Sequence, residues 1–213
     1  MEAVVFDMDG VIFDTEYLVL ESWAKTGEAH GIVGTDEVCR KCLGTTYEVS
    51  KQIFLDHYGA DFPYEKYKAE MRAYFLEAIE DGIPLKPGIR EILEYLHGNG
   101  FKVGLASSTR RAVVLDELEK SELTDYFDVI IGGDLLKKSK PEPDIYLMAC
   151  HELAVDPKNA YAIEDSYNGI RAAYAAGMKP IMVPDLMPPT KEMEEKSVVI
   201  CKDLLEAMKF IEA

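Results

Sequence analysis

Residues 3–10 read Ala-Val-Val-Phe-Asp-Met-Asp-Gly, so a short apolar run ends abruptly in two aspartates and a glycine. An apolar run of this length is typical of a buried strand. Asp7 and Asp9 are two residues apart, and alternate residues of an extended chain point to the same side. We therefore expect both carboxylates to face one site, unless the turn that Gly10 permits begins between them. A plain surface turn is the alternative.

Further short apolar runs alternate with amphipathic helical patterns along the chain. The runs are residues 103–106, 129–131, 161–163, 180–183 and 198–201, and the helical patterns are residues 89–96, 112–118, 145–153 and 170–176. This alternation is typical of α/β proteins, in which helices cover both faces of a parallel sheet. We predict a Rossmann-like parallel sheet core, with its ligand site at the carboxyl ends of the strands.

One segment interrupts the alternation. Helical patterns occur at residues 17–26, 47–57 and 64–80, without a convincing strand between them. We therefore predict an inserted all-helical domain of residues 16–82. The α/β core would then consist of residues 1–15 and 83–213, and the glycines and prolines near residue 84 would mark the return to it.

The charge balance restricts the choice of partners. The chain has 213 residues, with 39 acidic against 23 basic side chains and a formal net charge of −16. Such a surface repels the phosphates of nucleic acids and anionic lipids, so we expect no nucleic acid and no membrane as partner. Because the apolar N-terminal run is too short for a signal peptide, we expect a cytoplasmic protein, and a monomer as the default.

Four cysteines raise the question of a metal or redox site. Cys39 and Cys42 have C-x-x-C spacing, whereas Cys150 and Cys201 lie far apart in the sequence. A structural zinc needs four ligands. We therefore favour ordinary reduced thiols over a metal or redox role.

Three more strand ends carry residues that suit phosphate chemistry. Residues 107–109, Ser-Ser-Thr, open a helix, where a hydroxyl can donate to a phosphoryl oxygen; such residues are also common helix caps. Lys140 offers the local positive charge that an acidic protein needs for a phosphate ester, although most lysines are simply solvated. Glu164 and Asp165 offer the hard oxygen ligands that magnesium prefers, or form another acidic turn.

The order of these motifs is specific. DMDGVIFDT (residues 7–15), SST (107–109), KPEPDIY (140–146) and IEDSYNGI (163–170) together resemble the haloacid dehalogenase superfamily. Within it the chain is similar to the beta-phosphoglucomutase-like phosphatases, over essentially its whole length. The resemblance implies a magnesium-dependent (Mg2+) phosphatase that hydrolyses a small phosphorylated metabolite through an aspartyl-phosphate intermediate. It also implies that the helical insert is a cap domain.

The resemblance further implies roles for individual residues. Asp7 would be the nucleophile, and Asp9 the general acid and base. The transferring phosphoryl group would be bound by Ser107, Ser108 and Lys140. The Mg2+ ion would be held by Asp7, the backbone carbonyl of Asp9, Asp165 and, at or next to the metal shell, Glu164.

Two other classes of protein with strand-end acids fit less well. The resemblance implies that the dehalogenases of this superfamily lack the second aspartate of the motif, because breaking a carbon–halogen bond needs no proton donor there. Asp9 therefore argues against a dehalogenase. A phospho-accepting signalling receiver would show a shorter alternation of strands and helices without interruption. The insert of residues 16–82 is inconsistent with that class.

A beta-phosphoglucomutase is the alternative function. Mutases of this branch carry a histidine on the first cap helix, and a lysine and an arginine that flank the glycine of a cap loop. The matching places here hold Val19, Leu43 before Gly44, and Tyr47. Because this polar set is absent, a phosphatase is favoured. Contacts to the rest of the substrate, or simply solvated helix faces, are expected at Lys68, Arg72, Arg110 and Arg111.

Overall fold

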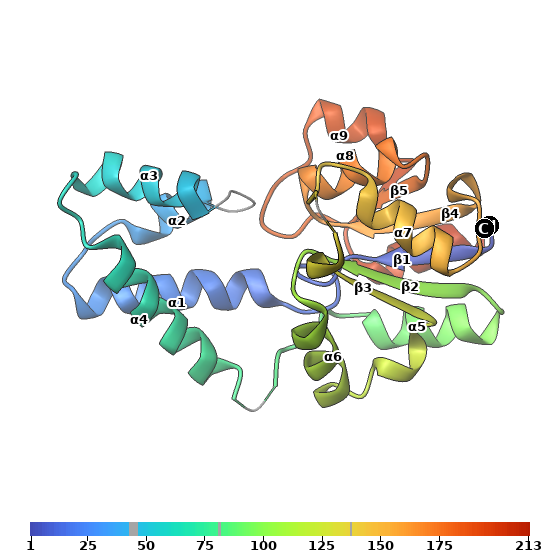
Figure 1. The fold of residues 1–213 in the computed structure, drawn as a ribbon, viewed down its shortest axis with the longest axis horizontal. Coiled ribbons are helices and arrows are strands. Elements are labelled where there is room, and N and C mark those ends of the chain that lie inside the picture. Colours follow the sequence, from blue (N-terminus) through green and yellow to red (C-terminus); the bar gives the residue numbers. More distant parts are fainter. Residues whose placement is uncertain (43–46, 81, 137) are drawn as a thin grey trace. The chain divides into compact units, whose positions relative to one another are not determined.

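The computed structural model describes residues 1–42, 47–80, 82–136 and 138–213 (Figure 1). The chain divides into two compact units. The core unit consists of residues 1–14 and 82–213, and the helical insert consists of residues 15–81. Leu43 and Gly44 lie outside the described residues, as does the side chain of Tyr47.

The core unit is built on a six-stranded parallel sheet in the order β3-β2-β1-β4-β5-β6. The strands are β1 (Ala3–Phe6), β2 (Lys102–Ser107), β3 (Val129–Gly132), β4 (Ala160–Glu164), β5 (Lys179–Met182) and β6 (Val199–Ile200). Phe6 of β1 pairs with Leu105 on one side and with Ile163 on the other. The chain runs outward from β1 to β3 and then returns to β4, so the strand order reverses beside β1. Ligands of open α/β sheets bind at such a switch point.

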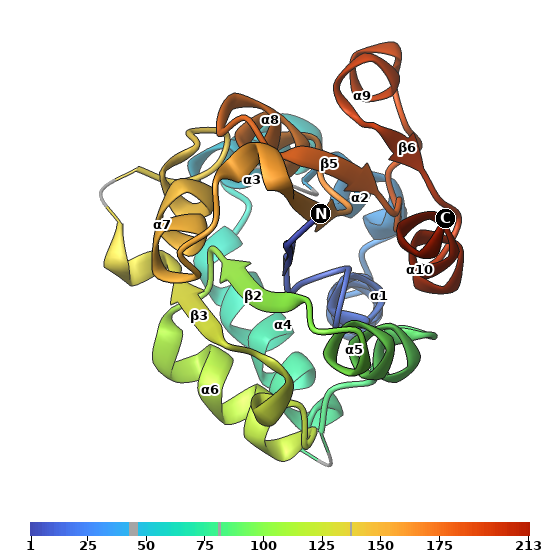
Figure 2. The same ribbon diagram turned by 90° about the vertical axis from the view of Figure 1, so that its right-hand side faces the viewer.

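Helices cover both faces of this sheet (Figure 2). One face carries α5 (Ile89–Gly98), α6 (Arg111–Lys120) and α10 (Leu204–Glu212), and the other carries α7 (Asp144–Glu152) and α8 (Tyr167–Ala175), with α9 (Lys191–Lys196) beside α8. Val4 and Phe6 pack in the first core cluster, whereas Ala3 and Val5 pack in the second. Burial on both faces explains why β1 is apolar throughout.

The predicted α/β class is confirmed, and its details differ from the prediction in two places. The sixth strand has two residues, because only Val199 and Ile200 pair with β5, where the apolar run had indicated four. Helices α9 and α10 were not predicted from the sequence. Short 3-10 turns complete the core unit at η1 (Thr124–Tyr126), η2 (Gly133–Leu135) and η3 (Pro157–Asn159).

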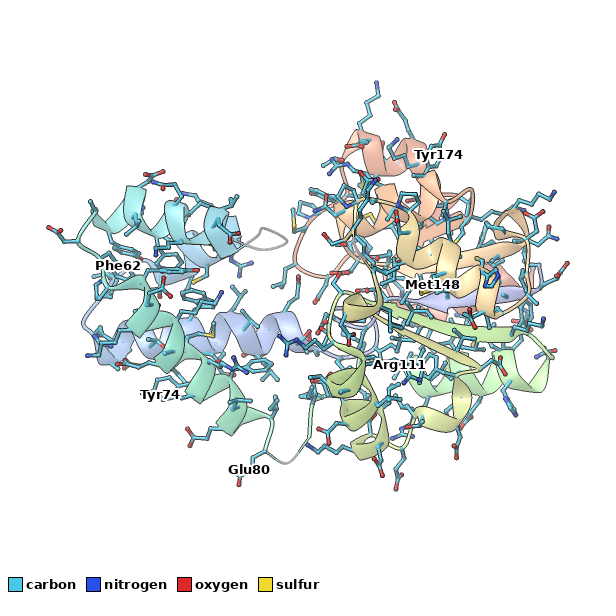
Figure 3. The ribbon with its side chains drawn as sticks, in the orientation of Figure 1. Phe62, Tyr74, Glu80, Arg111, Met148 and Tyr174 are labelled. Atoms are coloured by element: carbon cyan, nitrogen blue, oxygen red, sulfur yellow. The ribbon has the colours of Figure 1, made fainter. Side chains whose placement is uncertain are left out.

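The described part of the helical insert contains helices and no strand, as predicted. Its helices are α1 (Thr15–Ala29), α2 (Thr35–Cys42), α3 (Tyr47–Tyr58) and α4 (Tyr64–Ala78), of which α2 was not predicted. An aromatic cluster holds them together: Trp23 stacks on Phe54 with ring centroids 4.6 Å apart, and Phe62 lies 5.6 Å from Phe54 (Figure 3). Aromatic side chains bury large apolar areas, so this cluster serves as the core of the insert.

All four cysteines are free thiols. Burial raises the pKa of Cys150 and of Cys201 to about 11, and it also raises the pKa of Cys39 and Cys42. Because the thiolate is the reactive form of cysteine, burial keeps these side chains unreactive. None of the helices in the described ranges has the length and apolar character needed to cross a lipid bilayer.

Candidate active site

The chain leaves β1 in a tight turn that separates the two aspartates. The N–H of Asp7 still donates to a β4 carbonyl at 3.0 Å, whereas the carbonyl of Met8 already accepts the N–H of Ile12 at 2.8 Å. Gly10 has a φ of +78°, which favours glycine, and a Cβ atom there would lie 2.5 Å from Asp165 Oδ2. The turn therefore begins at Met8, and it requires glycine where the chain passes Asp165.

Lys140 lies at the centre of the candidate site. Its ammonium donates to Asp7 Oδ1 at 2.5 Å, to Glu164 Oε1 at 2.7 Å and to the carbonyl of Ala106 at 3.0 Å. Burial alone would lower the pKa of Lys140, but the charges of Asp7 and Glu164 raise it above its ordinary value. The lysine is therefore a permanent positive charge at the carboxyl end of β1.

Glu164 is completely buried, and both of its oxygens accept hydrogen bonds. Oε1 accepts from the ammonium of Lys140 and from the hydroxyl of Tyr146, each at 2.7 Å. Oε2 accepts from the Ser166 hydroxyl at 3.0 Å and from the Ser166 N–H at 3.3 Å. The same Ser166 hydroxyl caps α8 by accepting the N–H of Gly169 at 3.0 Å. A buried carboxylate needs this many donors, because an unpaired charge away from water is very unfavourable.

Three carboxylates converge beside this lysine. Asp7, Glu164 and Asp165 each offer an oxygen, and these oxygens lie within 4.8 Å of one another. Burial raises the pKa of Asp7 to about 7; the charge of Lys140 opposes this rise, and those of Glu164 and Asp9 add to it. Clustered carboxylate oxygens are the ligands that Mg2+ prefers, and a divalent cation would relieve their mutual repulsion. The donor set therefore fits Mg2+.

The second aspartate is held by a different partner. The hydroxyl of Thr109 donates to Asp9 Oδ2 at 3.2 Å, and the N–H of Thr109 donates to the buried hydroxyl oxygen of Ser107 at 3.0 Å. Ser108 is exposed in the same loop. The Asp9 carboxylate is not among the three that converge, although its charge acts on Asp7. The turn begins between the two aspartates, which is the exception stated for the strand pattern. The structure thus ties the loop after β2 to the turn after β1.

The first N–H of the helix after this loop is bound by a carboxylate from η2, the turn that follows β3. The N–H of Arg111 donates to Asp134 Oδ1 at 2.8 Å, and the Nε of Arg111 donates to the carbonyl of Ile130 at 3.1 Å (Figure 3). Thr109 is therefore not the cap of α6, because Arg110 holds that position. Arg110 itself is exposed.

The remaining basic candidates lie in the helical insert. Lys68 and Arg72 of α4 and Val19 of α1 line one pocket of about 380 Å³, together with Met71 and Phe75. Val19 thus belongs to a pocket wall that is apolar apart from the two basic side chains and Glu65.

Two residues near the site, Tyr146 and Glu117, were not singled out from the sequence, and Thr109 had been considered only as a helix cap. Glu117 lies half-buried on α6, and its Oε2 is buried without a hydrogen-bond partner among the described residues. Burial, and after it the charge of Asp9, raise the pKa of Glu117 to about 7. Tyr146 stands within the KPEPDIY motif, so its position carried a signal, whereas Glu117 occupies an ordinary surface-helix pattern without one.

A parallel sheet with an aspartate, a lysine and an acidic pair at its switch point defines a class of hydrolase. The sequence profile described as haloacid dehalogenase-like hydrolase matches residues 4–183, and the chain belongs to this family. It is 34% identical over 181 residues to the Phosphorylated carbohydrates phosphatase of Thermotoga maritima, with 85% of this chain and 84% of that protein covered.

Two further relatives place the chain within the family. It is 36% identical over 186 residues to the Beta-phosphoglucomutase of Bacillus subtilis, which covers 84% of this chain and 81% of that protein. The crystal structure of a beta-phosphoglucomutase-like protein from Thermotoga maritima superposes with a TM-score of 0.83 and 31% identity, over 100% of this chain and 99% of that one. The predicted membership is confirmed, and the chain is an enzyme of the phosphatase type.

Proposed function

We propose that this enzyme is a Mg2+-dependent phosphatase that hydrolyses a small phosphorylated sugar or related metabolite through an aspartyl phosphate on Asp7. The observation that carries the proposal is the buried carboxylate of Asp7 at the end of β1, contacted by Lys140 at 2.5 Å and clustered with Asp165. The name of the Thermotoga maritima phosphatase supports a phosphorylated carbohydrate as the substrate class.

In the first step, a carboxylate oxygen of Asp7 attacks the phosphorus of the ester. The bond between phosphorus and the leaving oxygen breaks, and Asp9 gives its proton to that oxygen. The positive charge of Lys140 offsets the charge on the transferring phosphoryl group. Hydroxyl and backbone donors of Ser107 and Ser108 would complete the binding of the phosphoryl oxygens, because their loop follows the neighbouring strand β2.

In the second step, water attacks the phosphorus of the aspartyl phosphate. Asp9 accepts a proton from this water, the bond between phosphorus and Asp7 breaks, and inorganic phosphate leaves with the Asp7 carboxylate restored. Two displacements through a covalent intermediate are each easier than one direct attack by water. Asp9 can serve in both steps because it is a different side chain from the nucleophile, and its carboxylate accepts a hydrogen bond from the Thr109 hydroxyl at 3.2 Å.

The carboxylates of Asp7 and Asp165 and the backbone carbonyl of Asp9 would hold the Mg2+ ion. When bound, the ion supplies positive charge that neutralises the phosphoryl group and orients it. Glu164 would stand at the edge of the metal shell, since its two oxygens already accept hydrogen bonds from Lys140, Tyr146 and Ser166.

The mutase alternative differs in what accepts the phosphoryl group from Asp7. A mutase must orient a sugar hydroxyl there through polar contacts, because hydrogen bonds discriminate hydroxyl groups better than apolar fit does. Val19 stands where these mutases carry a histidine, and a valine side chain offers no hydrogen bond. The phosphatase is therefore favoured.

A pair of assays tests this choice. Phosphate release is measured from a panel of sugar phosphates and other small phosphate esters, beside a coupled assay for glucose 6-phosphate formed from beta-glucose 1-phosphate and primed with the bisphosphate. We expect steady phosphate release and slow or absent isomerisation. Fast isomerisation with negligible phosphate release would overturn the phosphatase and establish the mutase.

A further inference from the structure

Tyr146 is completely buried on α7, next to the lysine of the site. Its hydroxyl donates to Glu164 Oε1 at 2.7 Å, and the ammonium of Lys140 donates to the same oxygen at the same distance. The ammonium also lies 5.1 Å from the centre of the Tyr146 ring. Tyr146, which is outside the proposed catalytic set, therefore contacts both the carboxylate of Glu164 and the ammonium of Lys140.

The ammonium of Lys140 donates all three of its hydrogens. An ammonium has three donors, and here they reach Asp7, Glu164 and the carbonyl of Ala106. Asp7 and Glu164 consequently compete for one cation. Glu164 is the more deeply buried of the two, so it has the greater need of a donor.

The Tyr146 hydroxyl changes this competition. It gives Glu164 Oε1 a second donor, while Ser166 donates to Oε2. The carboxylate therefore has its hydrogen bonds without drawing Lys140 away from Asp7. Burial raises the pKa of Tyr146 well above its ordinary value, and the charge of Glu164 adds to this rise. The hydroxyl is the donor of this hydrogen bond, because an ionised carboxylate only accepts.

We propose that Tyr146 is a positioning residue of the phosphatase reaction, which shares Glu164 Oε1 with Lys140 and so holds the ammonium where it also reaches Asp7. The inference rests on the proposed function, since the place of Lys140 matters only if phosphoryl transfer occurs at Asp7. Without the hydroxyl, Lys140 is the one remaining donor to Oε1 in the described part of the chain, and we expect its ammonium to move toward Glu164 and away from Asp7.

The test is Tyr146→Phe, with Tyr67→Phe as the matched control. Tyr67 is also buried and donates its hydroxyl to a backbone carbonyl, that of Trp23, at 2.9 Å, but it lies in the aromatic core of the insert. Both changes delete one buried hydroxyl, so thermal denaturation should show similar losses of stability. The readouts are kcat, KM and the inhibition constant of inorganic phosphate.

We expect Tyr146→Phe to lower kcat about tenfold and to raise the inhibition constant of phosphate about tenfold, as for the loss of a hydrogen bond to a charged group. Tyr67→Phe should leave both values within about twofold. In a Lys140→Met background, Tyr146→Phe should change phosphate affinity less than about twofold, because the hydroxyl acts through the lysine.

Normal kcat and phosphate inhibition in Tyr146→Phe would overturn the inference, and so would an equal loss of activity in Tyr67→Phe. Asp7→Asn separates this failure from that of the proposed function. An inactive Asp7→Asn protein beside a fully active Tyr146→Phe enzyme would refute the positioning role alone. Turnover by Asp7→Asn would refute the proposed function itself.

Discussion

Gly169 lies directly against the carboxylate of Glu164: a Cβ atom at this glycine would stand 1.8 Å from Glu164 Cδ. Glycine inside a helix is less favourable than alanine by about 1 kcal/mol. Helix α8 therefore gives up intrinsic stability so that the buried carboxylate can lie against its first turn. The position of Glu164, and through it that of Lys140, depends on this close approach.

Gly169→Ala should destabilise the protein and reduce its activity. The added methyl group overlaps Glu164, and overpacking of this kind costs about 1–3 kcal/mol. Gly98→Ala is the matched control, because Gly98 also lies in a helix and has no atom within 4 Å of its ideal Cβ position. Urea denaturation should show a loss for Gly169→Ala and no loss for Gly98→Ala. Equal stability of the two variants would contradict the close contact.

Asp7→Asn should abolish turnover, because an amide cannot form the acyl phosphate. We expect a loss of at least ~10³-fold in kcat, larger than the loss of a single transition-state donor. The variant should remain folded, since burial already disfavours the charge of Asp7. Phosphate release and circular dichroism measure the two effects. Hydrolysis near the wild-type rate by a folded variant would rule out Asp7 as the nucleophile.

Removal of Mg2+ by a chelator should stop phosphate release, and added Mg2+ should restore it. Asp165→Ala should weaken Mg2+ binding and lower the rate together, because Asp165 is one of the three converging carboxylates. Asp116→Ala, which removes an exposed carboxylate of α6, is the control and should leave both unchanged. Calcium should inhibit, because it prefers more ligands in a looser geometry. Full activity in excess chelator is the result that would exclude metal dependence.

The stability of the metal-free protein should fall as the pH rises from about 5 to about 7. The pKa of Asp7 and that of Glu117 are both raised to about 7 by burial, whereas ordinary carboxyl groups titrate near pH ~4. In this window the folded state holds protons that the unfolded state has released, so the free energy of unfolding decreases with pH and levels off above about 7.

Denaturation in urea at several pH values between 5 and 8 measures this slope. Glu117→Gln should flatten it in part, because glutamine cannot titrate, and Asp7→Asn should flatten it further. A free energy of unfolding that rises through this window in the metal-free wild type, with no change in either variant, would show that neither carboxyl group titrates there.

Magnesium affinity should change with pH in the opposite sense. A protonated Asp7 must release its proton before it binds a cation, so affinity rises with pH until the group is ionised. With a pKa of about 7, the gain should be close to tenfold per pH unit below this value and small above it. Calorimetric titration with Mg2+ between pH 5.5 and 8.5 tests this. An affinity that is constant over the range would show that Asp7 is ionised throughout.

The sequence by itself determined the kind of fold and the identity of the candidate site. The apolar run of residues 3–6 before Asp7, the alternation that follows and the KPEPDIY and IEDSYNGI motifs are local patterns. They were sufficient to predict a parallel sheet, a helical insert and a site at the strand ends, because strand and helix periodicity and turn residues are properties of neighbouring residues. Helices α2, α9 and α10 were not predicted; α2 and α9 are short, so their apolar periodicity is brief.

Only the tertiary structure decided which side chains are partners. Tyr146 meets Glu164 across 18 positions of the sequence, and Thr109 meets Asp9 across 100. These pairs depend on the register of β1 between β2 and β4 and on the rotation of helices over the sheet, which no local pattern encodes. For the same reason the sequence left open whether a turn begins between Asp7 and Asp9. It begins at Met8, where the backbone closes its own hydrogen bonds instead of continuing the strand.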